Sequence, residues 1–404
     1  MKKTIVPIGP YHPLLEEPEH FRLYVEGERV VDVDVEIGYN HRGIEKLSES
    51  KTWDQVTFLI ERICGICSTS HPMAYCLAVE DLVGCRVPKR TQFIRVVVCE
   101  LERIHSHLLW VGLAGHFIGY NTVWMWAWKY REIILEICEK LTGNRNHYGM
   151  FKPGGVRRDF NEEQIEYALN RIEELKKPLK MLTDAILDDP VIHLRLKGVG
   201  VLSYEDAILY SALGPTSRGS GVPWDARKDD PLDGWRDLQW NVIVQKSGDV
   251  FAKAVVRLLE CFESISLIEQ ALNKMTPGPI DERIREVPPG EGIGRYEAPR
   301  GEVFHYVRSD GSNSPYRHKV RAPTFNNLPT FKVSCVGETI ADVALITASI
   351  DPCYCCTERV SVVDKFGNEN TLREDDLVKM SAIKTEQIIK KLGKTPTLLK
   401  KGVS

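Results

Sequence analysis

The chain has no long apolar segment of the kind that crosses a bilayer. Its most hydrophobic stretches, such as residues 122–128 and 341–350, are shorter than the roughly 20 residues that a spanning helix needs. Met1 and the two lysines after it lead into no apolar run that would form a secretory signal. We therefore expect a protein with no export signal and no membrane span of its own.

The sequence also lacks a strong excess of charge. Its 53 Lys and Arg residues stand against 56 Asp and Glu residues, for a formal net charge of −3, which argues against bulk electrostatic binding of nucleic acid. Internal repeats and low-complexity segments are missing too. With 404 residues, 43% of them hydrophobic and 27% charged, the composition is that of a globular protein with a large core.

Cysteine is present in an informative pattern. Eleven cysteines without an export signal predict reduced thiols in a cytoplasmic setting. Four of them form two pairs, Cys64 with Cys67 and Cys353 with Cys356, and a spacing of three residues lets both sulfurs of a pair face one point. Two such pairs can supply four thiolates to one site, although thiolates suit zinc, iron–sulfur clusters, copper(I) and nickel alike. The other seven, including Cys355, are expected to be small buried residues.

The distance between the two pairs helps to separate the alternatives. In zinc ribbons, paired cysteines lie about 15–20 residues apart, whereas Cys67 and Cys353 are 286 residues apart. A thioredoxin-like redox motif needs a single pair near a βαβ pattern. On spacing alone, structural zinc is the less favoured interpretation but stays open.

The pattern of apolar residues divides the chain into four segments. They are an N-terminal β region, a helical core with the first cysteine pair, a loop-rich α+β part with the second pair, and a basic tail: residues 1–43, 44–276, 277–360 and 361–404. If the two pairs share a metal, the segments must form one interwoven body. The predicted fold class is therefore α+β, with a mainly helical bundle core, an N-terminal β-hairpin region and a loop-rich C-terminal part.

Individual elements follow from periodicity and turn residues. Alternating apolar residues predict a hairpin, and spacings of three and four predict helices. Asn161 with Gln164 matches a capping box, and Ser203 with Asp206 a second helix start. The predicted strands are 21–25, 30–37, 303–307, 331–333 and 360–363. The predicted helices are 91–113, 122–141, 161–187, 251–272, 341–349 and 385–392, with a turn at 365–368.

The residues around the cysteine pairs resemble the large subunit of nickel–iron hydrogenases. The matching patterns are R-x-C-G-x-C-x-x-x-H over residues 62–71 and D-P-C-x-x-C over residues 351–356. Further stretches resemble the membrane-associated, energy-converting (Ech-type) branch of that family: residues 9–13, 38–46, 102–110, 154–159, 214–221 and 295–302. These stretches are shared with the 49-kDa-type subunit of respiratory complex I, which lacks the four cysteines.

The resemblance implies a bimetallic centre. Cys64 and Cys353 correspond to terminal ligands of nickel, and Cys67 and Cys356 to bridges between nickel and an iron that carries CO and cyanide. Cys353 also matches the thiolate that acts as the first base when H2 is split into a proton and a hydride.

Further roles are implied around this centre. Glu17 matches the glutamate that carries protons away, Arg300 an arginine over the two metals, and His71 a hydrogen-bond donor to a bridging sulfur. Without the resemblance, Glu17 would be interpreted as a surface acid and His71 as a structural histidine. Glu45 matches a ligand of an additional magnesium or iron ion. Arg359 occupies the place of a histidine that binds this ion in relatives, so the extra site stays open.

The function implied is that of a catalytic subunit that interconverts H2 with protons and electrons, in ferredoxin-linked H2 evolution coupled to ion translocation. The chain has no further cysteine set for an iron–sulfur relay, so an iron–sulfur small subunit must carry the electrons. Integral membrane subunits would hold the protein at the cytoplasmic face of the cell membrane. The alternatives are a complex I-like connecting subunit and a sulfur-reducing relative without hydrogenase activity. The tail after Arg359 is expected to be retained, with its lysines facing solvent, a partner subunit or lipid.

Overall fold

The computed structural model describes residues 3–12, 15, 17–230, 232–357, 362–363, 369–370 and 374–392. Residues 1–358 form one compact unit and residues 359–404 a second one. Arg359, the first two residues of the strand predicted over 360–363 and the turn predicted over 365–368 lie outside the described residues, whereas residues 362–363 are described and form a strand.

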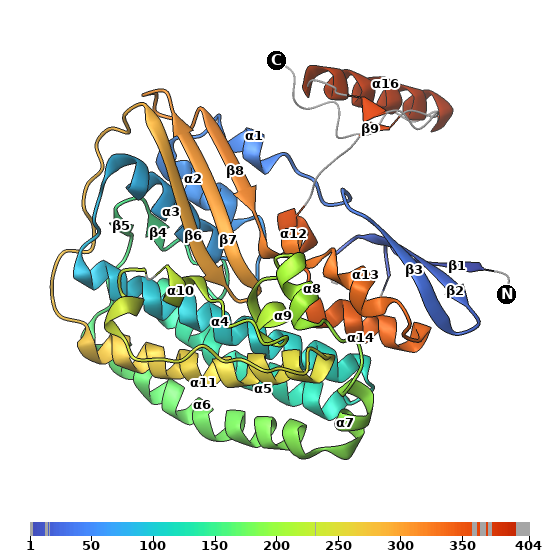
Figure 1. Cartoon of the computed structure of the whole chain (residues 1–404). Coiled ribbons are helices and arrows are strands. Elements are labelled where there is room, and N and C mark those ends of the chain that lie inside the picture. Colours follow the sequence, from blue (N-terminus) through green and yellow to red (C-terminus); the bar gives the residue numbers. More distant parts are fainter. Residues whose placement is uncertain are drawn as a thin grey trace. The chain divides into compact units, whose positions relative to one another are not determined.

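An antiparallel sheet is formed by the first three strands, β1 (Thr4–Ile8), β2 (His20–Glu26) and β3 (Arg29–Glu36), in the order β1-β2-β3 (Figure 1). Alternate residues of β2 are buried, among them Phe21 and Leu23. Gly27 makes the tight turn between β2 and β3 with a φ of +65°, which favours glycine. The predicted hairpin is confirmed; β1 was not predicted.

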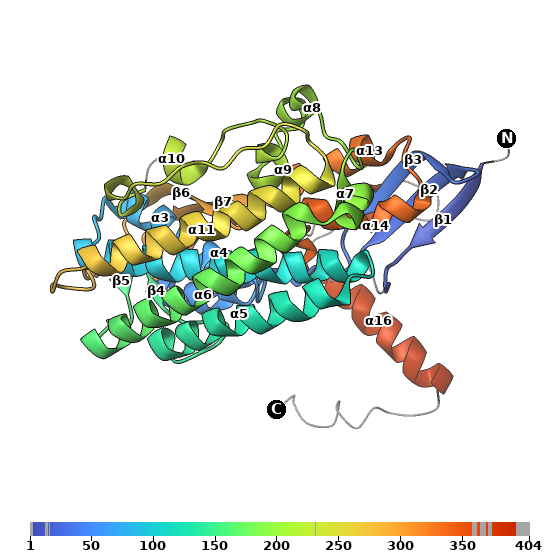
Figure 2. The same cartoon turned by 90° about the horizontal axis from the view of Figure 1, so that it is seen from below.

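Four long helices lie side by side and make the bundle: α4 (Lys89–Phe117), α5 (Asn121–Thr142), α6 (Glu162–Asp188) and α11 (Val250–Lys274) (Figures 1 and 2). The middle of α4 is buried on nearly every face, because α5 and α11 pack on it. Asn161 caps α6 in a reciprocal capping box with Gln164, as predicted from the sequence.

Short elements connect the bundle to the rest of unit 1. They are α1 (Ile44–Ser48), α2 (Trp53–Glu61), α3 (Ser70–Val83), β4 (Phe151–Lys152), β5 (Gly155–Val156), α7 (Pro190–Leu196), α8 (Tyr204–Leu209), α9 (Gly214–Arg218), α10 (Ala226–Asp229) and the 3-10 helix η1 (Trp235–Asp237). The Ser203 side chain caps α8, as expected.

A second antiparallel sheet contains β6 (Gly290–Ala298), β7 (Gly301–Ser309) and β8 (Arg317–Arg321), and α3 packs against β6 and β7. Glycines in β6 allow this close approach: a Cβ added to Gly294 would lie 2.0 Å from the carbonyl oxygen of Ala74. Burial alternates along β7, so His305 faces inward between Val303 and Val307. The sheet thus presents a buried histidine to the helix that follows the first cysteine pair.

Four short helices complete unit 1: α12 (Pro323–Asn327), α13 (Thr330–Cys335), α14 (Ile340–Ile350) and α15 (Tyr354–Thr357). The strand predicted over 331–333 is wrong, because these residues belong to α13. Phe331 and Ser334 share the buried side of that helix, and the Phe331 ring packs edge-on against Phe21 at 4.9 Å. The other predicted helices of unit 1 are confirmed within a few residues.

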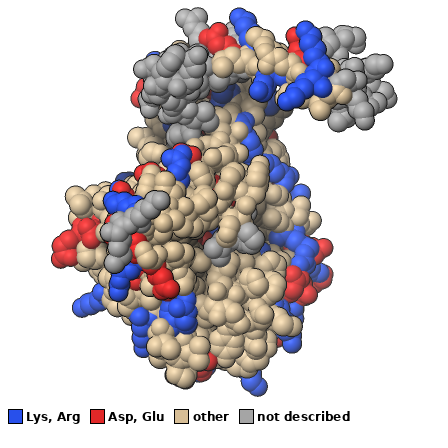
Figure 3. Space-filling model, turned by 90° about the vertical axis from the view of Figure 1, so that its right-hand side faces the viewer, with Lys and Arg blue, Asp and Glu red and all other residues tan. Residues whose placement is uncertain are grey.

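Unit 2 contains the helix α16 (Glu374–Leu392) and a short antiparallel pair, β9 (Val362–Val363) with β10 (Glu369–Asn370). Lys379, Lys384, Lys390 and Lys391 are exposed on α16, and basic side chains are prominent at the surface of this unit (Figure 3). No helix in the described part of the chain combines the length and apolar character that crossing a bilayer requires.

Candidate metal centre

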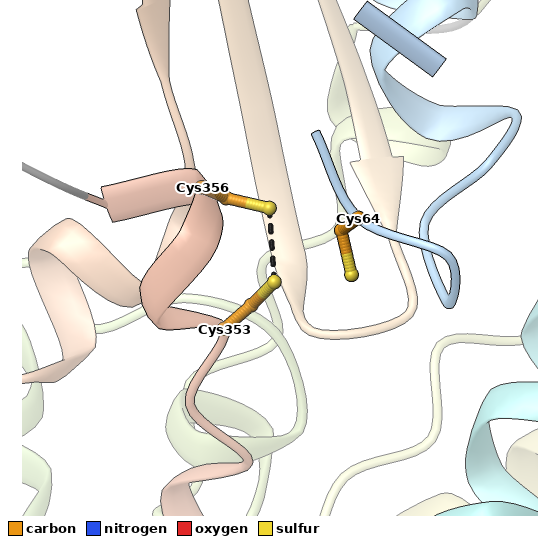
Figure 4. A group of neighbouring side chains, drawn as sticks. All are labelled: Cys64, Cys353 and Cys356. Carbon is orange, nitrogen blue, oxygen red and sulfur yellow. Dashed lines mark hydrogen bonds between the residues drawn. The ribbon is translucent and has the colours of Figure 1, made fainter. Parts of the chain in front are cut away.

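Two segments far apart in the sequence bring the cysteine pairs together. The Sγ atoms of Cys64, Cys353 and Cys356 all lie within 4.8 Å of one another, and those of Cys353 and Cys356 are 2.9 Å apart. Cys64 projects from the loop after α2 toward the two cysteines around α15 (Figure 4). Cys67 interacts with the sulfurs of Cys64 and Cys353, and all four side chains are buried.

A tight loop holds the first pair. The backbone N–H of Ile66 donates to the sulfur of Cys64 at 3.4 Å. A Cβ on Gly65 would approach the side-chain nitrogen of Asn146 to 2.9 Å, so the loop packs closely on residues that follow α5. The hydroxyl of Ser68 lies 2.7 Å from Asn146 Oδ1 and strengthens the same contact. This packing fixes the direction in which the two sulfurs project.

Glu102 on α4 anchors the start of α3, directly after the first pair. Its carboxylate accepts hydrogen bonds from the backbone N–H of Thr69 and the hydroxyl of Ser70. A carboxylate at a helix N-terminus is favourable because it faces unpaired N–H groups. Burial nevertheless raises the pKa of Glu102 to about 7.

The second pair follows a sharp end of α14. Asp351 stops the helix in the left-handed region, with a φ of 56°. The N–H of Cys353 donates to the hydroxyl of Thr324 at 2.9 Å, and the hydroxyl of Thr357 donates to the carbonyl of Cys353 at the same distance. The backbone around Cys353 is therefore held from both sides.

Arg300 lies beside the thiols. Its Nε donates to Asp351 Oδ1 at 2.7 Å, and its Nη1 is 3.7 Å from the sulfur of Cys67. The guanidinium is 2% exposed, so it carries its charge into the protein interior. Gly214, at a φ of +66°, lets α9 approach the backbone of Arg300, where a Cβ would be 2.4 Å from the carbonyl oxygen. The structure thus places Arg300 next to the cysteine cluster.

Glu17 contacts the second cysteine motif from the segment before β2. Its Oε2 accepts a hydrogen bond of 2.7 Å from the backbone N–H of Cys355. Burial and the negative charge of Cys64 raise the pKa of Glu17 above that of an ordinary glutamate. A carboxyl in this place can take up a proton near the thiols at a higher pH than a surface acid can.

His71 lies on α3 and reaches Cys356. Its Nε2 is 3.3 Å from the sulfur of Cys356, and its Nδ1 is 3.0 Å from Nε2 of His305. Burial lowers the pKa of His71 to about 4, so the ring is neutral at neutral pH.

Glu45 has different neighbours. Its carboxylate accepts from the backbone N–H of Val320 at 3.0 Å and pairs with Lys319 at 2.8 Å. Among the described residues, Cys64, Cys353 and Cys356 are the one set of three or more close metal-ligand side chains. The role of Glu45 in an additional metal site stays a prediction.

The charge balance of the cysteines suits a bound cation. Hydrogen bonds from the thiols of Cys353, Cys356 and Cys67 lower the pKa of Cys64 well below its usual range. The pKa values of the other three thiols are raised, first by hydrogen bonds within the cluster for Cys67 and Cys353, and first by burial for Cys356. Because thiolates this close repel one another, four of them need compensating positive charge, and metal ions supply it. The donor set therefore fits a thiolate-bound metal centre.

Several residues around the site were not predicted. Arg257 on α11 lies 3.6 Å from Asp351 Oδ2 and makes a second cation beside that carboxylate. His305 and His318 extend the contacts of His71. A sequence signal existed for both histidines, since each occupies an inward position in an alternating strand. The sequence gives no comparable signal for Arg257, because an arginine on a helix is as compatible with a solvent-facing position as with a buried one.

Comparison with known proteins adds independent information. A family model for the 49-kDa subunit of respiratory-chain NADH dehydrogenase matches residues 118–287 and 282–359. A model for nickel-dependent hydrogenases matches residues 42–112, which include the first cysteine pair.

Individual relatives match most of the chain. The membrane-bound hydrogenase subunit alpha of Pyrococcus furiosus is 43% identical, over 97% of this chain and 96% of that protein. The carbon monoxide-induced hydrogenase of Rhodospirillum rubrum is 38% identical, over 89% of this chain and 100% of that protein. A chain in the solved membrane-bound sulfane sulfur reductase, an archaeal respiratory membrane complex, has a TM-score of 0.84 at 33% identity and covers 88% of this chain and 98% of its own length.

Proposed function

Because this chain belongs to the family that unites nickel-dependent hydrogenase large subunits with the 49-kDa subunit of respiratory NADH dehydrogenase, we propose that it is the catalytic subunit of a membrane-associated nickel–iron hydrogenase. Its reaction is the interconversion of H2 with protons and electrons, in the direction of ferredoxin-linked H2 evolution coupled to ion translocation. The observation that carries the proposal is the buried meeting of the two cysteine pairs.

The four cysteines would hold the metals. Cys64 and Cys353 would bind nickel alone, and Cys67 and Cys356 would bridge nickel to an iron with CO and cyanide ligands. When bound, this centre would supply the place where H2 is split or formed. Buried thiolates around a metal with an open position are the arrangement that such chemistry needs.

The protein itself would handle protons and charge. The Cys353 sulfur would accept the proton, and the Glu17 carboxyl would take it onward. Its raised pKa makes it a better proton acceptor than an ordinary glutamate. Arg300 would keep positive charge beside Cys67, and its ion pair with Asp351 would hold the guanidinium in place. His71 would support the bridging sulfur of Cys356.

The remaining parts of the reaction need other subunits. An iron–sulfur small subunit would carry electrons to and from the centre, and a ferredoxin-type carrier would exchange them through further subunits. Integral membrane subunits would hold the complex at the cytoplasmic face of the cell membrane. The relatives named for membrane-bound complexes support the association with membrane subunits.

A second candidate is sulfur reduction, which is favoured by the likeness to the sulfane sulfur reductase at 33% identity. A complex I-like connecting role is less well supported, because all four cysteines are present and buried, and the sulfurs of Cys64, Cys353 and Cys356 lie together. The two enzyme candidates differ in substrate, so activity separates them.

The test is to purify the whole complex and to supply reduced ferredoxin with either protons alone or polysulfide. We expect H2 evolution, and we expect Cys64→Ser to abolish it, while Cys85→Ser, a change at a partly buried cysteine outside the cluster, leaves it intact. Polysulfide reduction without H2 formation would refute the hydrogenase proposal and support the sulfur reductase.

A further inference from the structure

Three histidines form a continuous buried chain that starts at the sulfur of Cys356. His71 Nε2 lies 3.3 Å from that sulfur, and His71 Nδ1 lies 3.0 Å from Nε2 of His305. His305 Nδ1 is 2.9 Å from Nε2 of His318, and His318 Nδ1 is 2.9 Å from the hydroxyl of Ser48 on α1. Both ring nitrogens of every histidine therefore have a partner in the chain.

The protein encloses this chain completely. His305, His318 and Ser48 are 0% exposed and His71 is 1% exposed. The ring of Tyr75 packs against His318 at 5.3 Å and against His305 at 6.5 Å. Burial lowers the pKa of His318 to about 4 and holds that of His305 well below its usual range, so both rings are neutral at neutral pH.

Because the three imidazole rings are neutral, the hydrogen bonds between them must all run in the same direction. A neutral imidazole has one N–H and one acceptor nitrogen, and each contact between two nitrogens needs one proton. If one ring is turned to its other tautomer, every ring must follow, or a buried nitrogen loses its partner. All the protons thus point either toward the sulfur of Cys356 or toward Ser48.

Metal binding by Cys356 would decide which of these two directions the hydrogen bonds take. A metal-bound thiolate carries no proton and can only accept a hydrogen bond. The Ser48 hydroxyl can adapt, since it has two acceptors within reach: His318 Nδ1 at 2.9 Å and the carbonyl oxygen of Glu45 at 2.6 Å. The arrangement with Nε2–H of His71 donating to sulfur then follows.

We propose that His305 and His318 are positioning residues that fix His71 in the tautomer whose Nε2–H donates to the bridging sulfur of Cys356. Nε2–H of His305 donates to His71, Nε2–H of His318 donates to His305, and the Ser48 hydroxyl donates to His318. The chain thereby withdraws electron density from the sulfur. This inference rests on the proposed nickel–iron function.

The test compares two substitutions at the middle of the chain, in the complete purified complex. His305→Phe removes the donor to His71, whereas His305→Gln keeps a donor near the position of Nε2. His116→Phe is the control, since His116 is exposed on α4. The readouts are nickel and iron content and the infrared bands of iron-bound CO and cyanide, with circular dichroism to establish folding.

We expect the CO and cyanide bands of His305→Phe to move to lower wavenumber, because a thiolate without its donor gives more electron density to iron. Metal occupancy is expected to fall about 10–100-fold at limiting metal, as for other lost partners of metal-binding groups. His305→Gln should recover bands and occupancy close to those of the unchanged protein, and His116→Phe should match it.

Two results would overturn the inference: unshifted bands and full occupancy in His305→Phe, or a His305→Gln protein as defective as His305→Phe. If His305→Phe does not fold, the comparison of His305→Gln with the unchanged protein decides, and a defective but folded Gln variant counts against the chain. Absence of CO and cyanide bands from the unchanged complex would instead refute the nickel–iron function, and the inference with it.

Discussion

At the scale of single residues, the arginine and the glutamate beside the cysteines differ in their ability to exchange a proton. Arg300 contacts both Cys67 and Asp351, and a guanidinium stays protonated in this place. Glu17 accepts a hydrogen bond from the backbone N–H of Cys355, and its pKa is raised above that of an ordinary glutamate. A carboxyl of this kind can take up and release a proton, whereas a buried guanidinium keeps its proton.

The first prediction concerns Glu17→Gln, which preserves the shape of the side chain but removes the titrating group. We expect H2 evolution and H/D exchange with solvent to fall at least about 100-fold, the usual contribution of a positioned acid or base. Metal content should remain normal. Glu28→Gln, at an exposed turn, is the matched control, and an unchanged exchange rate in Glu17→Gln would exclude Glu17 from the proton route.

At the scale of elements, regular periodicity made the long helices predictable. The stripe of apolar residues in α11 and the capping box of α6 both depend on neighbours within a few positions. The three residues 331–333 were too short to distinguish strand from helix, and the burial of Phe331 is decided by its contact with Phe21. β6 was missed because its glycines, which lower strand propensity, are needed for contact with α3.

The second prediction tests that contact. Gly294→Ala would bring a Cβ to 2.0 Å from the carbonyl oxygen of Ala74, so α3 and β6 must separate. We expect the free energy of unfolding to fall by about 1–3 kcal/mol, as for other overpacked sites, measured by thermal or chemical unfolding. Gly278→Ala, where a Cβ meets nothing within 4 Å, should leave it nearly unchanged; equal effects of the two variants would contradict the argument.

The third prediction concerns the tail. The sequence after Arg359 continues into α16, a helix of 19 residues with exposed lysines. We predict that the working protein keeps this segment, and intact mass spectrometry of nickel-loaded complex measures it directly. A mass that ends at or near Arg359 would show that the segment is removed, and its lysines would then have no part in the finished enzyme.

At the scale of the whole molecule, the site depends on contacts that no local pattern encodes. The motifs identified both cysteine pairs, but their meeting requires α3 to pack on the second sheet and α15 to pack beside α12 and β8. The resemblance indicated Arg300, Glu17 and His71, which the structure places beside the cysteines. The sequence identified Asp351 only as part of the second cysteine motif. Its ion pair with Arg300 could not be predicted, because the two residues are brought together by the fold.

The fourth prediction follows from the electron path. Apart from the two cysteine pairs, the remaining seven cysteines are scattered through the sequence, which has no second motif for an iron–sulfur cluster. The isolated subunit should therefore neither oxidise H2 with viologen dyes nor accept electrons from ferredoxin, while the complete complex does both. Robust activity of the purified single chain would show that no iron–sulfur partner is needed.

The most direct test of the central claim is joint metal analysis and infrared spectroscopy of the mature complex. We predict nickel and iron in equal amounts in this subunit, with bands from iron-bound CO and cyanide, and loss of both metals in Cys353→Ser. Zinc alone in a fully matured preparation, without such bands, would contradict the nickel–iron account.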